Sequence, residues 1–345
     1  MALPGGDSGG SPPVDDTALF DLRQGRYALP MTQLALDLGV FERLGPDPRA
    51  TAAVGDAIGL SARGADAMFC VLAALGWIDL RPAGGAALTP VAMTYLRRDS
   101  PFFRGRLLEA TDPTLRALAV ACQRETGPAS PLAGALRDLS AGEVADFIGR
   151  MDALGRPAAP SLASQPPFCN ARRVLDVGGG SGCFSVALAC LHPGVRCTVF
   201  DRAPVCAAAE NSIRTAALSH RVHTHAGDMF SSPWPAGHDV VLFASIFHNW
   251  APPSIEGLTA RAFAALPAGG HVVVHEIPAD VGGKGALTAA CFSVAMLLHH
   301  CGRQYRLDEL GSFLEAGGFE AVQSAPSFGY YHAVWGRKPT SRRCP

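Results

Sequence analysis

The sequence has no excess of charge of either sign and few charged residues of any kind. Lysine and arginine total 29 and aspartate and glutamate total 30 among 345 residues, which gives a net charge of −1. Binding to nucleic-acid phosphates relies on a basic excess, so no nucleic-acid partner is expected. Because hydrophobic residues make up 48% and charged residues only 17%, a sizeable core is expected and general disorder is excluded.

Targeting segments and metal-binding patterns are also missing. No apolar stretch of roughly 18 residues lacks charges or helix breakers, so no membrane span is expected. The Gly/Pro/Ser-rich start lacks the basic and apolar regions of a signal peptide. The ten cysteines are scattered without a CxxC pair and several lie in apolar runs, which predicts reduced, buried thiols. We therefore expect a cytoplasmic protein without a metal site.

The first part of the chain is predicted to be helical after a flexible tail over 1–16. Apolar residues recur at helical spacing over 17–44, where Pro30 is expected to kink or divide the segment. A second helix is expected over 51–58, and a third runs to Leu75 with Ser61 as its N-cap.

Gly76 is expected to end the third helix, and "WIDLRPAGGAALTP" then reads as a two-stranded wing with a Gly-Gly turn. Helix, helix and wing are the layout of a winged-helix module, which binds DNA or serves as a dimerisation platform. The candidate recognition helix carries little basic charge beyond Arg63, which favours dimerisation. We predict an all-α winged-helix-like dimerisation domain over 17–100 and a helical substrate-pocket region over 101–165.

The hydrophobic pattern of the sequence changes at the domain boundary expected near residue 165. Over 166–338, β-rich apolar runs alternate with helical stretches, followed by a short tail over 339–345. Strands alternating with helices predict an α/β, Rossmann-like, doubly wound parallel sheet. Ligands of such sheets bind at the carboxyl ends of the strands.

The sharpest motif is "VLDVGGGSGCFSVALA", in which a predicted strand runs into a glycine-rich turn. The glycines Gly178, Gly180 and Gly182 have GxGxG spacing, unlike the GxGxxG of dinucleotide binders. Together with Asp176 just before the loop, where a carboxylate can orient a cationic amino-acid end, this spacing favours S-adenosylmethionine over a nicotinamide cofactor.

Acidic residues end the next two predicted strands. Asp201 can accept hydrogen bonds from ribose hydroxyls, a device that nicotinamide enzymes share. In "AGDMF", Asp228 can accept from the adenine amino group and Met229 can cover the ring, although an N-cap or turn role for Asp228 stays open. Ser245, at the end of the fourth strand, completes the predicted cofactor contacts.

The catalytic candidate is His248, which lies just beyond the fourth strand in "IFHNW". A histidine there can act as general base toward a substrate hydroxyl. Such a base needs an orienting acceptor on its other ring nitrogen, and Glu276, which ends the fifth strand, is the best candidate. A purely structural role for either residue is the alternative.

With these residues in order, the chain resembles the S-adenosylmethionine-dependent O-methyltransferases typified by plant caffeic acid O-methyltransferase, vertebrate acetylserotonin O-methyltransferase and bacterial natural-product enzymes. The resemblance runs from about residue 17 to 338 and rests on "ALPMTQLALDLGVFERL", "LDVGGGSG", "GDMF" and the HxW of His248 and Trp250. It implies a homodimer, a small aromatic acceptor and S-adenosylhomocysteine as product, with no metal and no membrane. It also implies that His248 is the base, that Glu276 is its partner, and that Phe147, Met151 and Met296 line the acceptor pocket, with plain core packing as the alternative for these three. We add Trp250 and His300 to the predicted pocket, with a helix-capping role as the alternative for His300.

Three positions depart from the family pattern. Asn249 stands where aspartate is usual, Gln304 stands where a second carboxylate is common, and Ala244 replaces a lysine that often contacts the adenine side. A glutamine carbonyl can still accept the imidazole hydrogen bond, so Gln304 is kept as a catalytic candidate. The favoured function is O-methylation of an aromatic natural product. Carbon or nitrogen methylation, a nicotinamide-dependent oxidoreductase and a non-catalytic binding protein are the alternatives.

Overall fold

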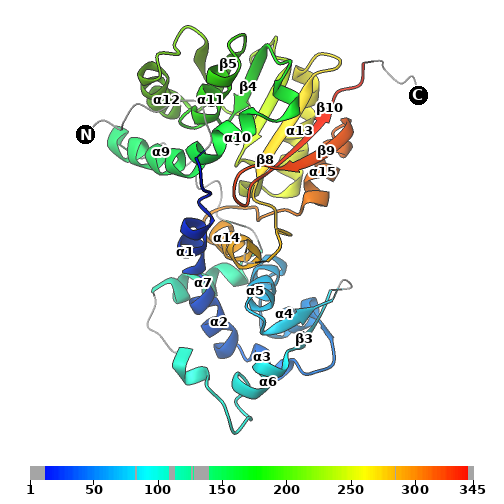
Figure 1. Cartoon of the computed structure of the whole chain (residues 1–345). Helices are drawn as coiled ribbons and strands as arrows, with labels where there is room; N and C mark the ends of the chain where they lie inside the picture. Colours follow the sequence, from blue (N-terminus) through cyan, green and yellow to red (C-terminus); the bar gives the residue numbers. More distant parts are fainter. Residues whose placement is uncertain are drawn as a thin grey trace. The chain divides into compact units, whose positions relative to one another are not determined.

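The computed structural model describes residues 12–81, 84–108, 113–125, 127, 140–283 and 285–340 (Figure 1). It divides the chain into two compact units. The first unit comprises Met1–Asp16, Leu132–Pro278 and Tyr305–Pro345, and the second comprises Thr17–Pro131 and Ala279–Gln304. The expected tails over 1–16 and 339–345 lie mostly outside the described residues. The chain therefore passes from the first unit to the second at Thr17, returns to the first at Leu132, and enters the second again over Ala279–Gln304.

The second unit is mainly helical. Its described helices are α1 (Thr17–Gly25), α2 (Ala28–Asp37), α3 (Val40–Arg43), α4 (Thr51–Ala57), α5 (Ala62–Ala74), α6 (Pro90–Tyr95), the 3₁₀ turn η1 (Gly105–Leu108), α7 (Pro113–Gln123) and α14 (Gly285–His299). Figure 1 shows α14, in orange, beside α1 and α5. The segment over 17–44 is divided before Pro30, which lies in the first turn of α2, where its missing N–H costs no hydrogen bond.

Local sequence signals set the ends of α5 as expected. The Ser61 hydroxyl accepts the backbone N–H of Gly64 and caps the helix, while Gly76 takes a left-handed φ of +75° just beyond it. The wing follows as β2 (Ile78–Leu80) paired antiparallel with β3 (Gly85–Leu88). A third strand, β1 (Arg49–Ala50), pairs with β3. Two residues are too short for a periodicity signal, so the sequence did not predict β1.

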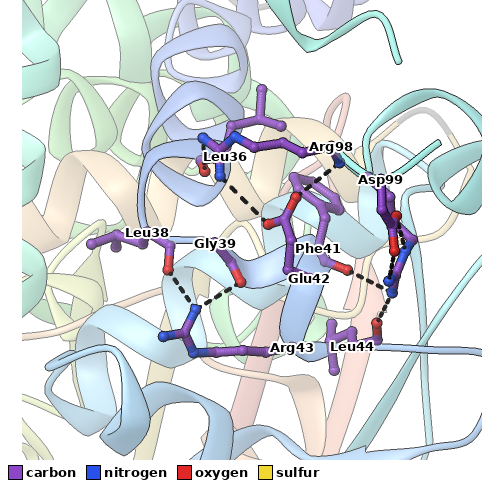
Figure 2. Close-up of polar contacts among 10 residues, drawn as sticks. Leu36, Leu38, Gly39, Phe41, Glu42, Arg43, Leu44, Arg98 and Asp99 are labelled. Carbon is purple, nitrogen blue, oxygen red and sulfur yellow. Dashed lines mark hydrogen bonds and ion pairs between the residues drawn. The ribbon is translucent and has the colours of Figure 1, made fainter. Parts of the chain in front are cut away.

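Two consecutive arginines that follow α6 bind residues of α2 and of α3 and its C-cap in the second unit (Figure 2). The Arg98 guanidinium donates to Leu36 O at 2.7 Å, and its backbone N–H donates to Glu42 Oε1 at 3.0 Å. Arg97 donates to the carbonyls of Phe41 and Leu44 at 3.4 and 3.0 Å. The two Arg97 bonds satisfy carbonyl groups at the end of α3, where the last carbonyls of a helix have no intrahelical partner.

The first unit is built on a seven-stranded sheet of order β6-β5-β4-β7-β8-β10-β9. The strands are β4 (Arg173–Val177), β5 (Arg196–Asp201), β6 (Val222–Ala226), β7 (Val240–Ala244), β8 (His271–Glu276), β9 (Glu320–Pro326) and β10 (His332–Arg337). The first five strands in this order are parallel, and β10 runs antiparallel to both β8 and β9. The α/β, Rossmann-like prediction is confirmed, with an antiparallel extension that sequence pattern alone did not separate from the parallel strands.

Side-chain alternation along the strands produces two cores, one on each face of the sheet. On one face, Val174, Val199 and Leu242 pack against α10 (Ala159–Ala163), α11 (Cys183–Leu191) and α12 (Ala203–Thr215). On the other face, Leu175 and Phe243 pack against α13 (Pro252–Ala265) and α15 (Leu307–Ala316). The unit also contains α9 (Ala141–Gly155) and the 3₁₀ turns η2 (Arg156–Ala158), η3 (Pro166–Phe168) and η4 (Phe247–Asn249). Burial on both faces explains why the central strands β4, β7 and β8 read as apolar runs.

Among the described residues, no single helix is long and apolar enough to cross a membrane. Helices α4 and α5 reach the length only as a pair, and they meet at 116°. The nine cysteines within the described ranges are all free of disulfide bonds.

Candidate functional site

The glycine-rich turn after β4 exposes bare backbone at the carboxyl edge of the sheet. Gly178, Gly180 and Gly182 all have left-handed φ values, of +71°, +56° and +75°. A Cβ at Gly178 would lie 2.4 Å from Ile246 Cδ1, whereas one at Gly180 would meet no atom within 4 Å. The turn therefore packs tightly at its base and leaves open space at Gly180, where a ligand can approach the backbone.

Asp176 lies beneath this turn and is completely buried. Its Oδ2 accepts the Ser185 hydroxyl at 2.8 Å, while Oδ1 has no hydrogen-bond partner among the described residues. Burial raises the pKa of Asp176 to about 7, and the charge of Asp201 adds to this rise against the opposing Ser185 hydrogen bond. An orphaned carboxylate oxygen of this kind fits a cationic ligand group, which would favour its ionised form.

Asp201, at the end of β5, is tied to the glycine turn. Its Oδ2 accepts Gly180 N at 3.0 Å and its Oδ1 accepts Arg202 N at 2.7 Å. Desolvation raises the pKa of Asp201, opposed by these two backbone donors. Each carboxylate oxygen has two lone pairs, so the residue retains acceptor capacity for a ribose hydroxyl.

Asp228 takes part in a turn as well as lying at the predicted cofactor edge. Its Oδ1 accepts Phe230 N at 2.8 Å and Ser231 N at 3.2 Å, and its Oδ2 accepts Arg202 Nη1 at 3.1 Å. The turn role that the sequence left open is therefore real. The contact from Arg202 was not predicted, because it joins two strand ends that only the folded sheet brings together.

Met229 and Trp250 border the same edge. A Cβ at Gly178 would lie 3.2 Å from Met229 Cε, so this thioether packs over the first glycine of the turn. Trp250 stacks edge-on against Phe230, with ring centroids 4.7 Å apart, and its carbonyl accepts the Tyr305 hydroxyl at 2.6 Å. The aromatic rings at this edge provide apolar surface next to the carboxylates.

His248 and Glu276 form a short, buried pair. His248 lies in η4 after β7, Glu276 ends β8, and Nδ1 of the imidazole lies 2.5 Å from Glu276 Oε2. The side chains are 9% and 3% exposed. Glu276 Oε1 also accepts Phe247 N at 2.8 Å, so the carboxylate fixes both the ring and the backbone that carries it. The parallel pairing of β7 and β8 explains why residues 28 positions apart meet here.

The contact between Asn249 and Ser245 explains why asparagine can stand at position 249, where the family usually has aspartate. Ser245 has a φ of +56°, rare for a residue with a side chain, and its carbonyl accepts Asn249 Nδ2 at 3.2 Å. A carboxylate at position 249 could not donate this hydrogen bond. Asn249 therefore has a structural role in the turn that precedes His248.

The predicted pocket residues fall in both units. Phe147 and Met151 lie on α9 in the first unit, and Phe147 packs against Val144, Ile148 and Val205. Met296 lies on α14 and is 5% exposed, His300 follows that helix, and both belong to the second unit with Gln304. Gln304 N donates to Ser293 Oγ at 3.1 Å, and no described residue bonds its buried side-chain amide.

Sequence reasoning missed a contact between α9 and the glycine turn. The Ser181 hydroxyl donates to Asp152 Oδ1 at 2.7 Å, and Arg156 holds the same carboxylate through Nε and Nη2 at 2.7 and 2.9 Å. The Asp152–Arg156 spacing is a helix-pair signal. Nothing in the sequence connects that pair to Ser181.

The described residues contain no group of three or more histidine, cysteine or acidic side chains that could hold a metal ion. The open turn at Gly180, the buried Oδ1 of Asp176 and the carboxylates at the next two strand ends instead fit an adenosine-containing cation. This fold and site define the class of S-adenosylmethionine-dependent methyltransferases, and the cofactor is S-adenosylmethionine.

Comparison with known proteins gives the family. Residues 157–320 match the O-methyltransferase domain model. The chain is 30% identical over 328 residues to 3-hydroxy-5-methyl-1-naphthoate 3-O-methyltransferase from Streptomyces sahachiroi, covering 92% of this chain and 94% of the relative. It is 26% identical over 302 residues to L-tyrosine C(3)-methyltransferase from Streptomyces lavendulae, covering 84% of this chain and 82% of that one.

Solved structures of methyltransferases have the same fold as this chain. An O-methyltransferase family 2 protein from Planctomyces limnophilus, in complex with apigenin, superimposes with a TM-score of 0.86 at 26% identity, covering 98% of this chain and 100% of that one. Human N-acetylserotonin methyltransferase in complex with S-adenosylmethionine gives a TM-score of 0.59 at 25% identity, covering 95% and 100%. The chain belongs to the O-methyltransferase family and is an S-adenosylmethionine-dependent O-methyltransferase.

Proposed function

We propose that the protein methylates a phenolic hydroxyl of an aromatic natural product and that His248 is the general base. The observation that carries this proposal is the buried His248–Glu276 pair at 2.5 Å, at the carboxyl edge of the sheet. With Nδ1–H donated to the carboxylate, the imidazole lone pair lies on Nε2, which can accept a proton. The naphthoate-methylating relative, and the solved O-methyltransferase family 2 structure in complex with the aromatic compound apigenin, support the substrate class.

The base is needed because a phenol titrates near pH 10 and is a weak nucleophile while protonated. His248 takes the hydroxyl proton as the oxygen attacks, and the negative charge of Glu276 stabilises the imidazolium that forms. S-adenosylmethionine, when bound, supplies an electrophilic methyl group. The remaining task of the protein is to align the acceptor oxygen in line with that methyl group.

We assign the cofactor contacts to the residues at the strand ends. Asp201 would accept the ribose hydroxyls and Asp228 the adenine amino group, with Met229 against the ring. The orphaned Oδ1 of Asp176 lies beneath the turn where the cationic amino-acid end would lie. Ser245 and the turn glycines would line the same space. Phe147, Met151, Trp250, Met296, His300 and Gln304 remain predictions for the acceptor pocket.

The test starts from the wild-type protein. Calorimetric titration with S-adenosylhomocysteine, with NAD as control ligand, measures cofactor binding. A panel of phenols is then screened by mass spectrometry for a gain of one methylene unit. His248→Ala should lower kcat by about 100- to 10,000-fold, as loss of a general base does, while S-adenosylhomocysteine binding stays nearly intact. His220→Ala, at an exposed histidine, is the matched control. Near-wild-type turnover by His248→Ala would contradict the assignment of His248 as the general base.

Methylation of an aromatic carbon is the second candidate, and the L-tyrosine C(3)-methyltransferase relative favours it. Deprotonation of a phenol by His248 would also activate the ring carbon next to the hydroxyl, so the same base serves both reactions. Assignment of the methyl position in the product by NMR separates the two. Cofactor binding without turnover on phenols, amines or aromatic carbons would instead favour a non-catalytic binding protein.

We also propose a homodimer formed through the second unit, as in the family this chain resembles. Leu19 and Leu22 on α1 are 69% and 78% exposed, and Leu29 on α2 is 44% exposed. Exposed leucines gathered on adjoining helices are typical of an interface with another protein surface. Light scattering after size exclusion should give twice the monomer mass, and Leu19→Ser with Leu22→Ser should reduce it. A monomeric wild-type protein would contradict this proposal.

A further inference from the structure

The glycine-rich turn over 178–182 has one side chain only, that of Ser181. Glycine adopts left-handed conformations readily, but it also gives the chain more conformational freedom than any other residue. A turn of this composition keeps one shape only where contacts outside it hold it. Ser181 is 4% exposed, so its hydroxyl lies in the interior of the first unit, where such a contact can form.

The Ser181 hydroxyl makes two hydrogen bonds. It accepts the backbone N–H of Cys183, the first residue of α11, at 3.3 Å. Gly182, the N-cap of that helix, has no side chain that could do so. The hydroxyl also donates to Asp152 Oδ1 at 2.7 Å. Ser181 therefore joins the turn both to the start of α11 and to α9.

Asp152 is held in place by its own helix. Arg156, the C-cap of α9, donates to Asp152 Oδ2 and Oδ1 at 2.7 and 2.9 Å, and the aspartate side chain is 19% exposed. Gly155 lets α9 approach α11 closely, since a Cβ at this position would lie 3.1 Å from Phe184 Cε2. The carboxylate thus has a fixed place on a helix that packs against the start of α11.

A second anchor of the turn comes from the sheet. Gly180 N donates to Asp201 Oδ2 at 3.0 Å, at the end of β5. Gly180 and Ser181 are adjacent, so consecutive residues of the turn are bonded to a strand end and to a helix. Asp201 is among the residues assigned to the cofactor, and Asp152 is not. Loss of the Asp152 bond would leave the turn attached to the sheet but no longer attached to α9.

We propose that Asp152 is a positioning residue for cofactor binding, which acts through the Ser181 hydroxyl to hold the glycine turn in the shape that receives S-adenosylmethionine. This inference rests on the proposed function, in which the turn lines the cofactor space, and adds to it a residue of α9. The role requires an acceptor oxygen at position 152. Removal of this oxygen should weaken cofactor binding although every residue assigned to the cofactor is retained.

The central experiment measures S-adenosylhomocysteine binding by calorimetry for Asp152→Ala and Asp146→Ala. Asp146 is an exposed aspartate on the same helix with Arg150 four residues beyond it, which is the spacing of Asp152 and Arg156. Asp152→Ala should raise the Kd about 10- to 100-fold, the scale of a hydrogen bond to a charged group. Asp146→Ala should stay within about twofold of wild type. Wild-type affinity in Asp152→Ala would overturn the proposal.

Two further variants test the route through Ser181. Asp152→Asn keeps an oxygen that accepts the Ser181 hydroxyl, so its Kd should lie within about fivefold of wild type. Ser181→Ala removes the same bond from the side of the turn. Combined with Asp152→Ala, it should give a Kd within about twofold of the weaker single variant, a clear departure from additivity. An asparagine variant as weak as the alanine variant, or two factors that multiply, would contradict the route.

Kinetics separate a role in cofactor binding from a role in the chemical step. With any acceptor found in the phenol screen, Asp152→Ala should raise the KM for S-adenosylmethionine. Its kcat at saturating cofactor should stay within about threefold of wild type, because the bound cofactor restores the shape of the turn. An equal fall in kcat and in kcat/KM would contradict the inference. Should Asp152→Ala fail to fold, Ser181→Ala breaks the same bond and is measured in its place.

Binding of S-adenosylhomocysteine requires neither an acceptor nor His248, so the two proposals fail separately. A wild-type protein without turnover, in which Asp152→Ala still weakens S-adenosylhomocysteine binding, would defeat the proposed reaction alone. An active wild type in which Asp152→Ala binds S-adenosylhomocysteine unchanged would defeat the role of Asp152 alone.

Discussion

Gly179 lies directly against the carboxyl group of Asp176. A Cβ built at Gly179 would be 2.7 Å from Asp176 Cγ and 2.8 Å from its Oδ2. The buried carboxylate and the glycine turn above it are therefore one packed unit, in which neither residue can change without moving the other.

Gly179→Ala should destabilise the protein and weaken cofactor binding. Relieving such an overlap costs about 1–3 kcal/mol, and the displaced turn would lose its fit to S-adenosylhomocysteine. Gly194→Ala, where no atom lies within 4 Å of the new Cβ, is the matched control and should change the unfolding free energy by less than about 0.5 kcal/mol. Urea unfolding and calorimetry measure both quantities. Wild-type stability and affinity in Gly179→Ala would refute the packing described here.

Asp176→Asn should remove a pH dependence of stability. Burial raises the pKa of Asp176 from 3.8 to about 7, so the folded state binds this proton more tightly than the unfolded state. The contribution of Asp176 to the free energy of unfolding is then greatest below pH 4, and this contribution is lost as the pH rises toward 7. The loss is about 4 kcal/mol for a three-unit shift. Unfolding curves from pH 4 to 8 should show wild type losing stability relative to Asp176→Asn, and parallel curves would contradict the prediction.

Glu276→Gln should be almost as damaging as loss of the base. Phe247 N and His248 N both point at Oε1, so the amide oxygen of glutamine takes that position and its NH₂ group faces Nδ1. The imidazole must then carry its proton on Nε2, where the lone pair is needed. A wrong tautomer of this kind costs up to about 10,000-fold in kcat. Glu256→Gln, at an exposed site on α13, should have no effect. If Glu276→Gln kept its turnover within tenfold of wild type, the tautomer of His248 would not control the reaction.

Arg97→Met should destabilise the second unit through its carbonyl contacts. The substitution leaves the carbonyls of Phe41 and Leu44 without their donor, at a cost of about 1–2 kcal/mol. The ion pair to Asp99 is exposed at the carboxylate, which is 65% accessible, so Asp99→Asn should leave thermal unfolding nearly unchanged. Equal effects of the two substitutions would show that the ion pair, and not the helix-end contacts, carries the stabilisation.

The sequence predicted the strand-end residues better than their partners. Apolar runs flanked by glycine or acidic residues located β4, β5 and β7, and parallel topology then brought Asp201, His248 and Glu276 to one edge. The bond from Arg202 to Asp228 and the bond from Ser181 to Asp152 could not be foreseen, because each joins segments that only the folded chain brings together. The left-handed backbone of Ser245 has no sequence signal, since serine rarely adopts it.

The position of β10 has a consequence for how the molecule is made. His332 pairs with Glu276 across the sheet, although β10 is synthesised well after β8. Until residues 332–337 have left the ribosome, β8 presents an unpaired edge, and an open edge of this kind invites pairing with other chains. We expect a nascent chain halted before β10 to need chaperone protection of this edge. Synthesis of β10 would then be the event that covers the open edge of β8.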